Sequence, residues 1–328
     1  MKELREDLKN DSYKRVYLLY GDERYLIKHY ERKLKEKIVP EAFEAMNLSV
    51  YNGKDISAET IMDSAETLPF FNDHRLIIAK NTGFFSQGRK EEADKLSGYV
   101  GEIPESSVII FVESEIDKRN GLYKKIVKSG RAVEFNTPSE KDLIKWIINY
   151  CKNQGKNMSV AVAVSLLRTV TNDMDNISSE LDKLIAYRAD ESEIRSEDVP
   201  KVCNKSLEAK IFDLVAAIGN KNVSAALEIF NNMLQLKESP LMVLAMIARQ
   251  FRMILLSKHL SEKGVSTEQI AEKLNIRSFI VRECIKQGRN FKTETLKNIF
   301  IKCLETDVKI KSGQMNDKLA VEMLILSI

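Results

Sequence analysis

The first residues that could do chemistry form a short turn with the sequence Gly21-Asp22-Glu23. The turn follows an apolar run at Val16–Tyr20 and precedes an amphipathic helical pattern over 22–39. In nucleotide-binding α/β proteins this turn carries G-x-x-x-x-G-K-[ST], whose backbone amides and lysine hold phosphates. Here one glycine remains, the Lys-Ser/Thr pair is missing, and the carboxylates of Asp22 and Glu23 would repel a triphosphate. The turn therefore predicts a degenerate phosphate loop and no nucleotide cofactor.

Two acids, Glu113 and Glu115, follow the apolar run 108–112, where an ATPase keeps its acids for magnesium. Without a phosphate loop they have no ligand to organise, so we expect both to be solvated loop residues. The three histidines have no His or Cys partner at the spacing of metal ligands. Neither G-x-S-x-G nor H-E-x-x-H occurs. We expect no catalytic site and no metal site.

Two adjacent aromatic residues follow a proline in the segment Leu68-Pro69-Phe70-Phe71. Both rings cannot face one core from a tight connection. One interpretation packs them beneath a sheet edge. In the other, Leu68, Phe70 and Phe71 form an apolar plug for a partner's pocket, since aromatic side chains on a Pro-stiffened turn lose little entropy on binding. The residues alone leave both open.

Residues 267–289 resemble the front of a helix-turn-helix, with Ala271 at the helix crossing and Ile276 in the turn. The second helix would place Arg277, Arg282 and Lys286 near DNA. Its other side chains are too apolar to lie in a groove: Phe279, Ile280, Val281, Cys284 and Ile285. We favour two helices of an all-α bundle. A regulator that reads DNA with 267–289 stays as the alternative.

Charge is unevenly distributed along the chain. Residues 209–328 hold 18 Lys/Arg and 12 Asp/Glu, so the other residues hold 33 of the 51 basic and 36 of the 48 acidic side chains. The last third is thus +6 and the remainder −3, which mildly favours a polyanion near the C-terminal part. Lys309 and Lys311 end a helical pattern, where lysines complement the helix dipole. In a ring-shaped complex around DNA they are candidates to face phosphates.

Composition limits the class of protein. A chain of 328 residues predicts two or three domains. No apolar run reaches the roughly 20 residues that span a bilayer, and the N-terminal sequence MKELREDLKN lacks the apolar core of a secretory signal. We therefore expect a cytoplasmic protein with no membrane contact. Four widely spaced cysteines are expected to be buried thiols: Cys151, Cys203, Cys284 and Cys303.

The elements that must position these residues fall into three predicted domains. Residues 1–138 alternate apolar runs with helical patterns, which predicts an α/β domain with a parallel sheet. The expected strands are 16–20, 47–51, 75–80, 108–112 and 132–135. Residues 139–205 predict a small helical bundle, a lid, and residues 206–328 predict an all-helical domain.

Six segments together resemble the delta subunits of the bacterial DNA polymerase III clamp loader. Three lie in the first domain: VYLLYGDERYLI, TLPFFNDHRLIIAKN and VIIFVESEIDKRNGLYKKI. Three lie in the last: AKIFDLVAAIGNKN, ESPLMVLAMIARQFRMIL and DVKIKSGQMNDKLAVEMLI. The resemblance runs from about Val16 to Ile328, and the motifs are more diagnostic together than singly.

The resemblance implies a degenerate AAA+ module, made of the α/β domain and the helical lid, that does not bind ATP. It implies a C-terminal collar domain that joins the gamma/tau ATPase subunits and delta-prime. It also implies that a plug at Leu68, Phe70 and Phe71 binds the beta sliding clamp and opens it for loading onto primed DNA. Such a subunit has no catalytic site of its own within the DNA-directed DNA polymerase holoenzyme. One departure is Phe70, where family members often have an aliphatic residue.

Overall fold

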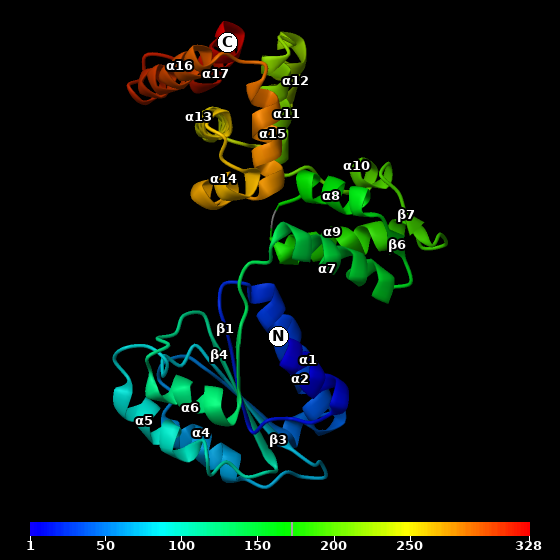
Figure 1. Cartoon of the computed structure of the whole chain (residues 1–328), viewed down its shortest axis with the longest axis vertical. Helices are drawn as coiled ribbons and strands as arrows, with labels where there is room; N and C mark the ends of the chain where they lie inside the picture. Colours follow the sequence, from blue (N-terminus) through cyan, green and yellow to red (C-terminus); the bar gives the residue numbers. More distant parts are fainter. Residues whose placement is uncertain (172) are drawn as a thin grey trace. The chain divides into compact units, whose positions relative to one another are not determined.

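The computed structural model describes residues 1–171 and 173–328 and divides into two compact units, Met1–Thr137 and Pro138–Ile328. The first unit is a parallel five-stranded sheet with helices, and the second is mostly helical (Figure 1). The predicted fold class, α/β followed by all-α, is confirmed.

All five strands of the first unit are parallel, in the order β2-β3-β4-β1-β5. The strands are β1 (Val16–Tyr20), β2 (Leu48–Asn52), β3 (Arg75–Lys80), β4 (Ser107–Glu113) and β5 (Arg131–Glu134). Every predicted strand is present, and each end lies within one residue of its expected place. Every residue of β1 is buried, because helices cover both faces of a parallel sheet and its strands are then apolar throughout.

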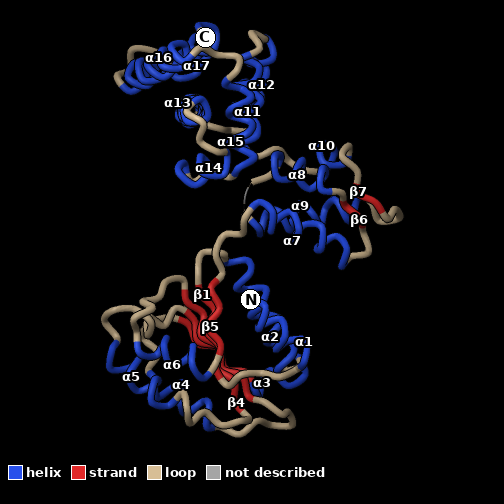
Figure 2. The backbone as a smooth tube through the Cα atoms, viewed as in Figure 1, coloured by secondary structure: helices blue, strands red, loops and turns tan. Residues whose placement is uncertain are grey.

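Helices lie on both faces of this sheet, α1 and α2 on one and α4, α5 and α6 on the other (Figures 1 and 2). Their bounds are α1 (Lys2–Asn10), α2 (Arg24–Ile38), α4 (Ala58–Glu66), α5 (Lys90–Tyr99) and α6 (Gly121–Ser129). Side chains alternate along each strand. Leu18, Ile77 and Phe111 belong to the core beneath α4, α5 and α6, whereas the neighbouring Tyr17 and Leu19 point to the opposite face.

Helix α1 was not predicted from the sequence. Its only fully buried side chain is Leu4, at 0% exposed. Asp7 anchors the helix to the sheet through Arg131, with 2.9 Å between Oδ1 and Nη2, and accepts a hydrogen bond from the Tyr17 hydroxyl. An ion pair between residues so far apart in sequence leaves no periodic signal. Between α2 and β2 the chain forms two short elements, η1 (Glu41–Phe43) and α3 (Glu44–Asn47).

The second unit begins with the predicted lid region, whose helices are α7 (Glu140–Asn153), α8 (Val160–Thr169), α9 (Met174–Tyr187) and α10 (Asp198–Val202). The expectation of a purely helical bundle is wrong in one detail. Strands β6 (Asn157–Met158) and β7 (Glu193–Ile194) pair in parallel beside these helices. Two residues per strand are too few to show an alternating pattern.

The remaining helices make up the region that was predicted to be all-helical: α11 (Leu207–Gly219), α12 (Val223–Gln235), α13 (Pro240–Glu262), α14 (Thr267–Leu274), α15 (Ser278–Gly288), α16 (Thr293–Lys311) and α17 (Asp317–Ser327). By length and composition alone, α13 could cross a membrane. However, Ile247, Phe251 and Ile254 from α13 lie at the centre of the helical core. We therefore interpret α13 as a core helix. All four cysteines are buried free thiols, as predicted.

Candidate functional site

The turn at the degenerate phosphate loop is short and already occupied by the chain itself. Only Gly21, Asp22 and Glu23 connect β1 to α2. Gly21 has φ +121°, and a Cβ there would lie 2.5 Å from the carbonyl oxygen of Phe135. The Glu23 N–H donates to that same oxygen over 3.0 Å. A backbone amide that a phosphate loop would offer to its ligand is thus used inside the fold.

Glu113 differs from its prediction as a solvated loop residue. Its side chain ends β4, is only 5% exposed and accepts hydrogen bonds from Thr82 N–H (2.8 Å) and Thr82 Oγ1–H (2.6 Å). Burial raises the pKa of Glu113, although the hydrogen bonds from Thr82 act in the opposite direction. The prediction was wrong because the Glu113 carboxylate accepts hydrogen bonds from the backbone and hydroxyl donors of Thr82, which follows the neighbouring strand β3. Glu115 is exposed, as expected.

At β1 and β4 these two features close the carboxyl edge of the sheet, where the carboxyl ends of its strands lie. Strands β1 and β4 are neighbours, and Tyr20 lies opposite Glu113. Parallel α/β sheets usually bind ligands outside this edge. Among residues 1–171 and 173–328, no cluster of three or more His, Cys, Asp or Glu side chains could hold a metal ion.

The amino edge, where the strands begin, carries the aromatic segment. Leu68, Phe70 and Phe71 lie in the loop before β3 and are 79%, 50% and 80% exposed. The two rings contact each other edge to face, with centroids 4.5 Å apart. The structure therefore does not bury these three side chains under the sheet edge, which was the first interpretation. Exposure is what a plug requires, while the binding itself stays a prediction.

Two further exposed apolar side chains adjoin this loop, and the sequence did not point to them. Phe43 and Met46 are 36% and 57% exposed. The side chain of Asn47 donates to the carbonyl oxygens of both Phe43 and Phe70, which places the two segments side by side. No periodicity marks Phe43 and Met46, because η1 and α3 are each about one turn long. Contiguous exposed apolar groups of this kind mark interaction sites.

A second exposed apolar surface lies on α16 and α17, which pack against each other. Its side chains are 44% to 61% exposed: Phe300, Ile301, Leu304 and Val308 from α16, and Leu319, Met323 and Leu326 from α17. We call it the α16–α17 surface. Lys309 and Lys311 are exposed near the end of α16, where Lys311 Nζ lies 2.8 Å from Asp307 Oδ2.

Two sequence families match this chain over most of its length. The family described as DNA polymerase III, delta subunit, matches residues 17–136, and the one described as the C-terminal domain of that subunit matches residues 208–328. The chain belongs to the DNA polymerase III delta-subunit family. It is thus a subunit of the DNA polymerase III holoenzyme by family.

Curated relatives and a solved structure agree with the delta-subunit family. The chain is 29% identical to DNA polymerase III subunit delta of Bacillus subtilis, covering 98% of this chain and 95% of that protein. It is 23% identical to a probable DNA polymerase III subunit delta of Aquifex aeolicus, covering 89% and 85%. The solved structure of the Bacillus subtilis DNA clamp loader delta protein superposes with a TM-score of 0.70 at 28% identity, covering 99% and 98%.

In this delta-family chain, α15 does not present itself as a DNA-reading helix. Phe279 is buried, and its N–H donates to Glu140 Oε2 over 3.0 Å. Arg282 Nη2 lies 2.7 Å from Glu140 Oε1. The start of α15, which a recognition helix directs at bases, is therefore capped by a carboxylate of α7. This geometry favours the bundle interpretation over the helix-turn-helix alternative.

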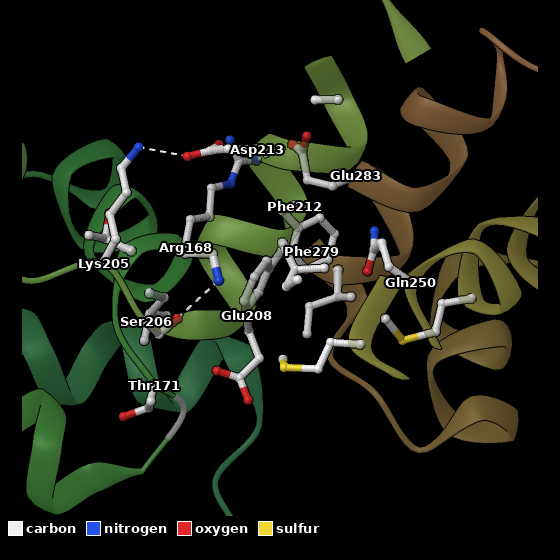
Figure 3. Close-up of a pocket in the computed structure, with 18 of the residues that line it drawn as sticks. Arg168, Thr171, Lys205, Ser206, Glu208, Phe212, Asp213, Gln250, Phe279 and Glu283 are labelled. Carbon is white, nitrogen blue, oxygen red and sulfur yellow. Dashed lines mark hydrogen bonds and ion pairs between the residues drawn. The ribbon is translucent and has the colours of Figure 1, made fainter. Parts of the chain in front are cut away.

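A cavity of about 460 Å³ lies within the second unit, between α8, α11, α13 and α15 (Figure 3). Phe212, Met246 and Met253 are among the apolar side chains that line it. Some of its polar groups are paired with one another: Gln250 donates to Gln287 over 2.9 Å, and an Arg168–Glu283 ion pair of 2.9 Å lies beside them. Its lining combines apolar side chains with charged ones, among them Lys205, Glu208 and Asp213.

Proposed function

We propose that this chain binds the beta sliding clamp through Leu68, Phe70 and Phe71 and opens it for loading onto primed DNA. The observation that carries the proposal is the exposure of these three side chains on a proline-containing loop, at 50% to 80% each. A soluble fold keeps adjacent aromatic side chains in water only at a cost, which burial in a partner's pocket removes. Membership in the delta family and the clamp-loader name of the Bacillus subtilis relative support the same function.

Apolar burial of this loop is proposed to supply part of the free energy of clamp binding. Burying each of the three side chains contributes at most about 2 kcal/mol. A net few kcal/mol remains after the loss of translational and rotational freedom. To open a ring, the plug must bind the open clamp more tightly than the closed one, since equal affinity for both states shifts no equilibrium.

The chain is proposed to act without ATP and without a catalytic site of its own. The connection between β1 and α2 has three residues, Gly21, Asp22 and Glu23, whereas the phosphate-loop motif has eight residues. The amide of Glu23 donates to Phe135, and two acidic side chains occupy the turn. ATP then acts through neighbouring subunits, by controlling whether the plug is accessible.

The C-terminal part is proposed to hold the assembly together. In this proposal residues 1–138 form the clamp-binding α/β domain, 139–205 the lid and 206–328 the collar. The α16–α17 surface of the collar is the apolar face available for the gamma/tau ATPase subunits and delta-prime. Lys309 and Lys311 are candidates to face primed DNA in the assembled complex, in the cytoplasm.

Binding of the purified chain to the cognate sliding clamp, without nucleotide, tests the proposal. Surface plasmon resonance should show wild-type binding and at least a hundredfold weaker binding for Phe70→Ala/Phe71→Ala, in line with the loss of about 3 kcal/mol of apolar burial. Leu304→Ala/Val308→Ala removes apolar side chains from the α16–α17 surface and is the matched control, with unchanged clamp affinity. Equal binding by a folded ring variant would disprove the plug. A wild-type chain that does not bind would disprove the clamp function.

A further inference from the structure

The loop that presents the aromatic rings is held by one buried asparagine. Asn47 ends α3 and is 0% exposed. Its Oδ1 accepts from the Phe70 N–H over 2.6 Å, and its Nδ2 donates to the Phe70 carbonyl oxygen over 2.8 Å. The side-chain amide thus pairs with both polar groups of one backbone residue, as a neighbouring strand would.

Two more side chains hold the end of the loop that leads into β3. Asn72 Nδ2 donates to the carbonyl oxygen of Ile38 over 3.1 Å. Arg75 Nε donates to the carbonyl oxygen of Ser64 over 2.8 Å, and Arg75 Nη1 donates to the carbonyl oxygen of Met46 over 2.8 Å. These bonds fix how the loop enters β3. Among residues 1–171 and 173–328, only the Asn47 side chain hydrogen-bonds to the backbone of the residues that carry the two rings.

The conformation at the rings needs such support. Phe71 has φ +50°, in the left-handed region that bulky side chains rarely adopt. Its ring is 80% exposed and so gains little from packing within the domain. A strained backbone persists only where its surroundings fix it. Next to Phe71, the backbone of Phe70 is fixed because Asn47 hydrogen-bonds to both its N–H and its carbonyl oxygen.

We propose that Asn47 is a positioning residue for partner binding, which rests on the function proposed above. By bonding Phe70 on both sides, it holds the rings of Phe70 and Phe71 outward before the partner arrives. A plug that is ordered in advance loses less conformational entropy on binding. Asn47 touches no partner in this arrangement and acts only through the loop.

A double-mutant cycle with the sliding clamp tests this inference. Asn47→Ala should raise the Kd about tenfold in the wild-type background. In the Phe71→Ala background, which lacks the more exposed ring, the same change should raise the Kd by threefold or less. Equal factors in both backgrounds would show that Asn47 acts independently of the rings, and would overturn the proposal. An unchanged Kd for Asn47→Ala in the wild-type background would also overturn it.

Asn120 provides the matched control for loss of stability. Its Nδ2 donates to the Phe84 carbonyl oxygen over 2.9 Å and its Oδ1 accepts from the Leu122 N–H over 2.8 Å, in the same domain but away from the plug loop. Asn120→Ala should lower the free energy of unfolding and change the Kd less than twofold. If it weakens clamp binding as much as Asn47→Ala does, a general loss of stability explains both variants and the proposal fails.

Amide hydrogen exchange supplies a readout that needs no clamp. The Phe70 amide should exchange at least tenfold faster in Asn47→Ala and remain unchanged in Asn120→Ala. Asn47→Asp keeps an acceptor for the Phe70 N–H and loses the donor, so it serves if the alanine variant does not fold. Unchanged Phe70 exchange in a folded Asn47→Ala variant would overturn the positioning. Asn47→Asp keeps the acceptor for this amide, so its readout is the clamp Kd, and an unchanged Kd would overturn the positioning as well. A wild-type chain that fails to bind the clamp would instead disprove the function on which this inference rests.

Discussion

The two edges of the first unit's sheet use opposite chemistry. At the carboxyl edge, polar groups form hydrogen bonds within the fold. The backbone N–H of Glu23 donates to the carbonyl oxygen of Phe135, and the carboxylate of Glu113 accepts from the Thr82 hydroxyl. At the amino edge, apolar groups point outward, with Phe71 80% exposed. Ligands of parallel α/β sheets usually bind at the carboxyl edge. In this chain that edge is closed at β1 and β4, and the exposed apolar surface lies at the opposite end of the strands.

This difference agrees with the proposal that the parallel sheet is kept here without a nucleotide ligand. In a parallel sheet the turn after β1 connects the strand to α2. A short turn makes this connection as well as a long one. Shortening it lets the backbone at Phe135 approach Gly21 closely. The loop before β3 is under no such constraint, because it only has to connect α4 to the sheet. It is free to carry a binding surface.

The largest expected effect concerns the closed edge. Gly21→Ala combines a φ of +121° with a Cβ placed 2.5 Å from the Phe135 oxygen, so we expect a loss of about 3 kcal/mol or more in the free energy of unfolding. Gly53→Ala is the matched control, because Gly53 has φ +108° and no atom within 4 Å of the added Cβ. It should lose only about 1–2 kcal/mol from backbone strain. Urea denaturation of the two variants measures the difference, and equal losses would show that the edge is not tightly closed.

The next expected effect concerns the buried acid at the same edge. The pKa of Glu113 is raised above its unfolded value by burial. Its contribution to stability is therefore present below the unfolded pKa of about 4.3 and is lost as the pH rises through the folded pKa. Glu113→Gln cannot ionise, so its free energy of unfolding should improve relative to wild type as the pH rises above that range. Urea denaturation from pH 4 to pH 8 measures this trend.

Glu115→Gln is the control for that pH series. Glu115 is two residues further along and exposed, so its carboxylate keeps its water in the folded chain. The Glu115→Gln curve should run parallel to that of wild type. A Glu113→Gln curve that is also parallel would mean that Glu113 is solvated in solution, as the sequence had suggested.

The sequence predicted the strands of this unit well but not the groups that finish its edges. β1 and β4 were recognisable because a strand buried on both faces is apolar throughout. Asn47 and Glu113 were not, because each acts on backbone groups 23 and 31 residues away, and a sequence pattern records only near neighbours. Helix α1 was missed for the same reason, since the Asp7–Arg131 ion pair joins residues 124 apart. The segment at 68–71 stood out because Pro-Phe-Phe is unusual in itself, but the residues alone did not decide whether its rings are buried or exposed.

The smallest expected effect concerns the strained residue of the plug and has opposite signs for stability and binding. Phe71 has φ +50° and is 80% exposed. Phe71→Gly should therefore relieve backbone strain and leave the free energy of unfolding unchanged or up to about 1 kcal/mol higher. It should weaken clamp binding, because the ring and the preordered backbone are both lost. Thermal or urea denaturation measures the change in the free energy of unfolding, and a binding measurement gives the change in the clamp Kd.

Phe70→Gly is the matched variant for this last comparison. Phe70 does not have a positive φ and is 50% exposed, so glycine there relieves no strain, loses the packing of a half-buried ring and adds freedom to the unfolded chain. It should lower the free energy of unfolding by about 1 kcal/mol and also weaken clamp binding. If Phe71→Gly were destabilising to the same extent, the Phe71 ring would be packing against the domain rather than standing ready for a partner. The amino edge would then hold its side chains within the fold, as the carboxyl edge does at β1 and β4.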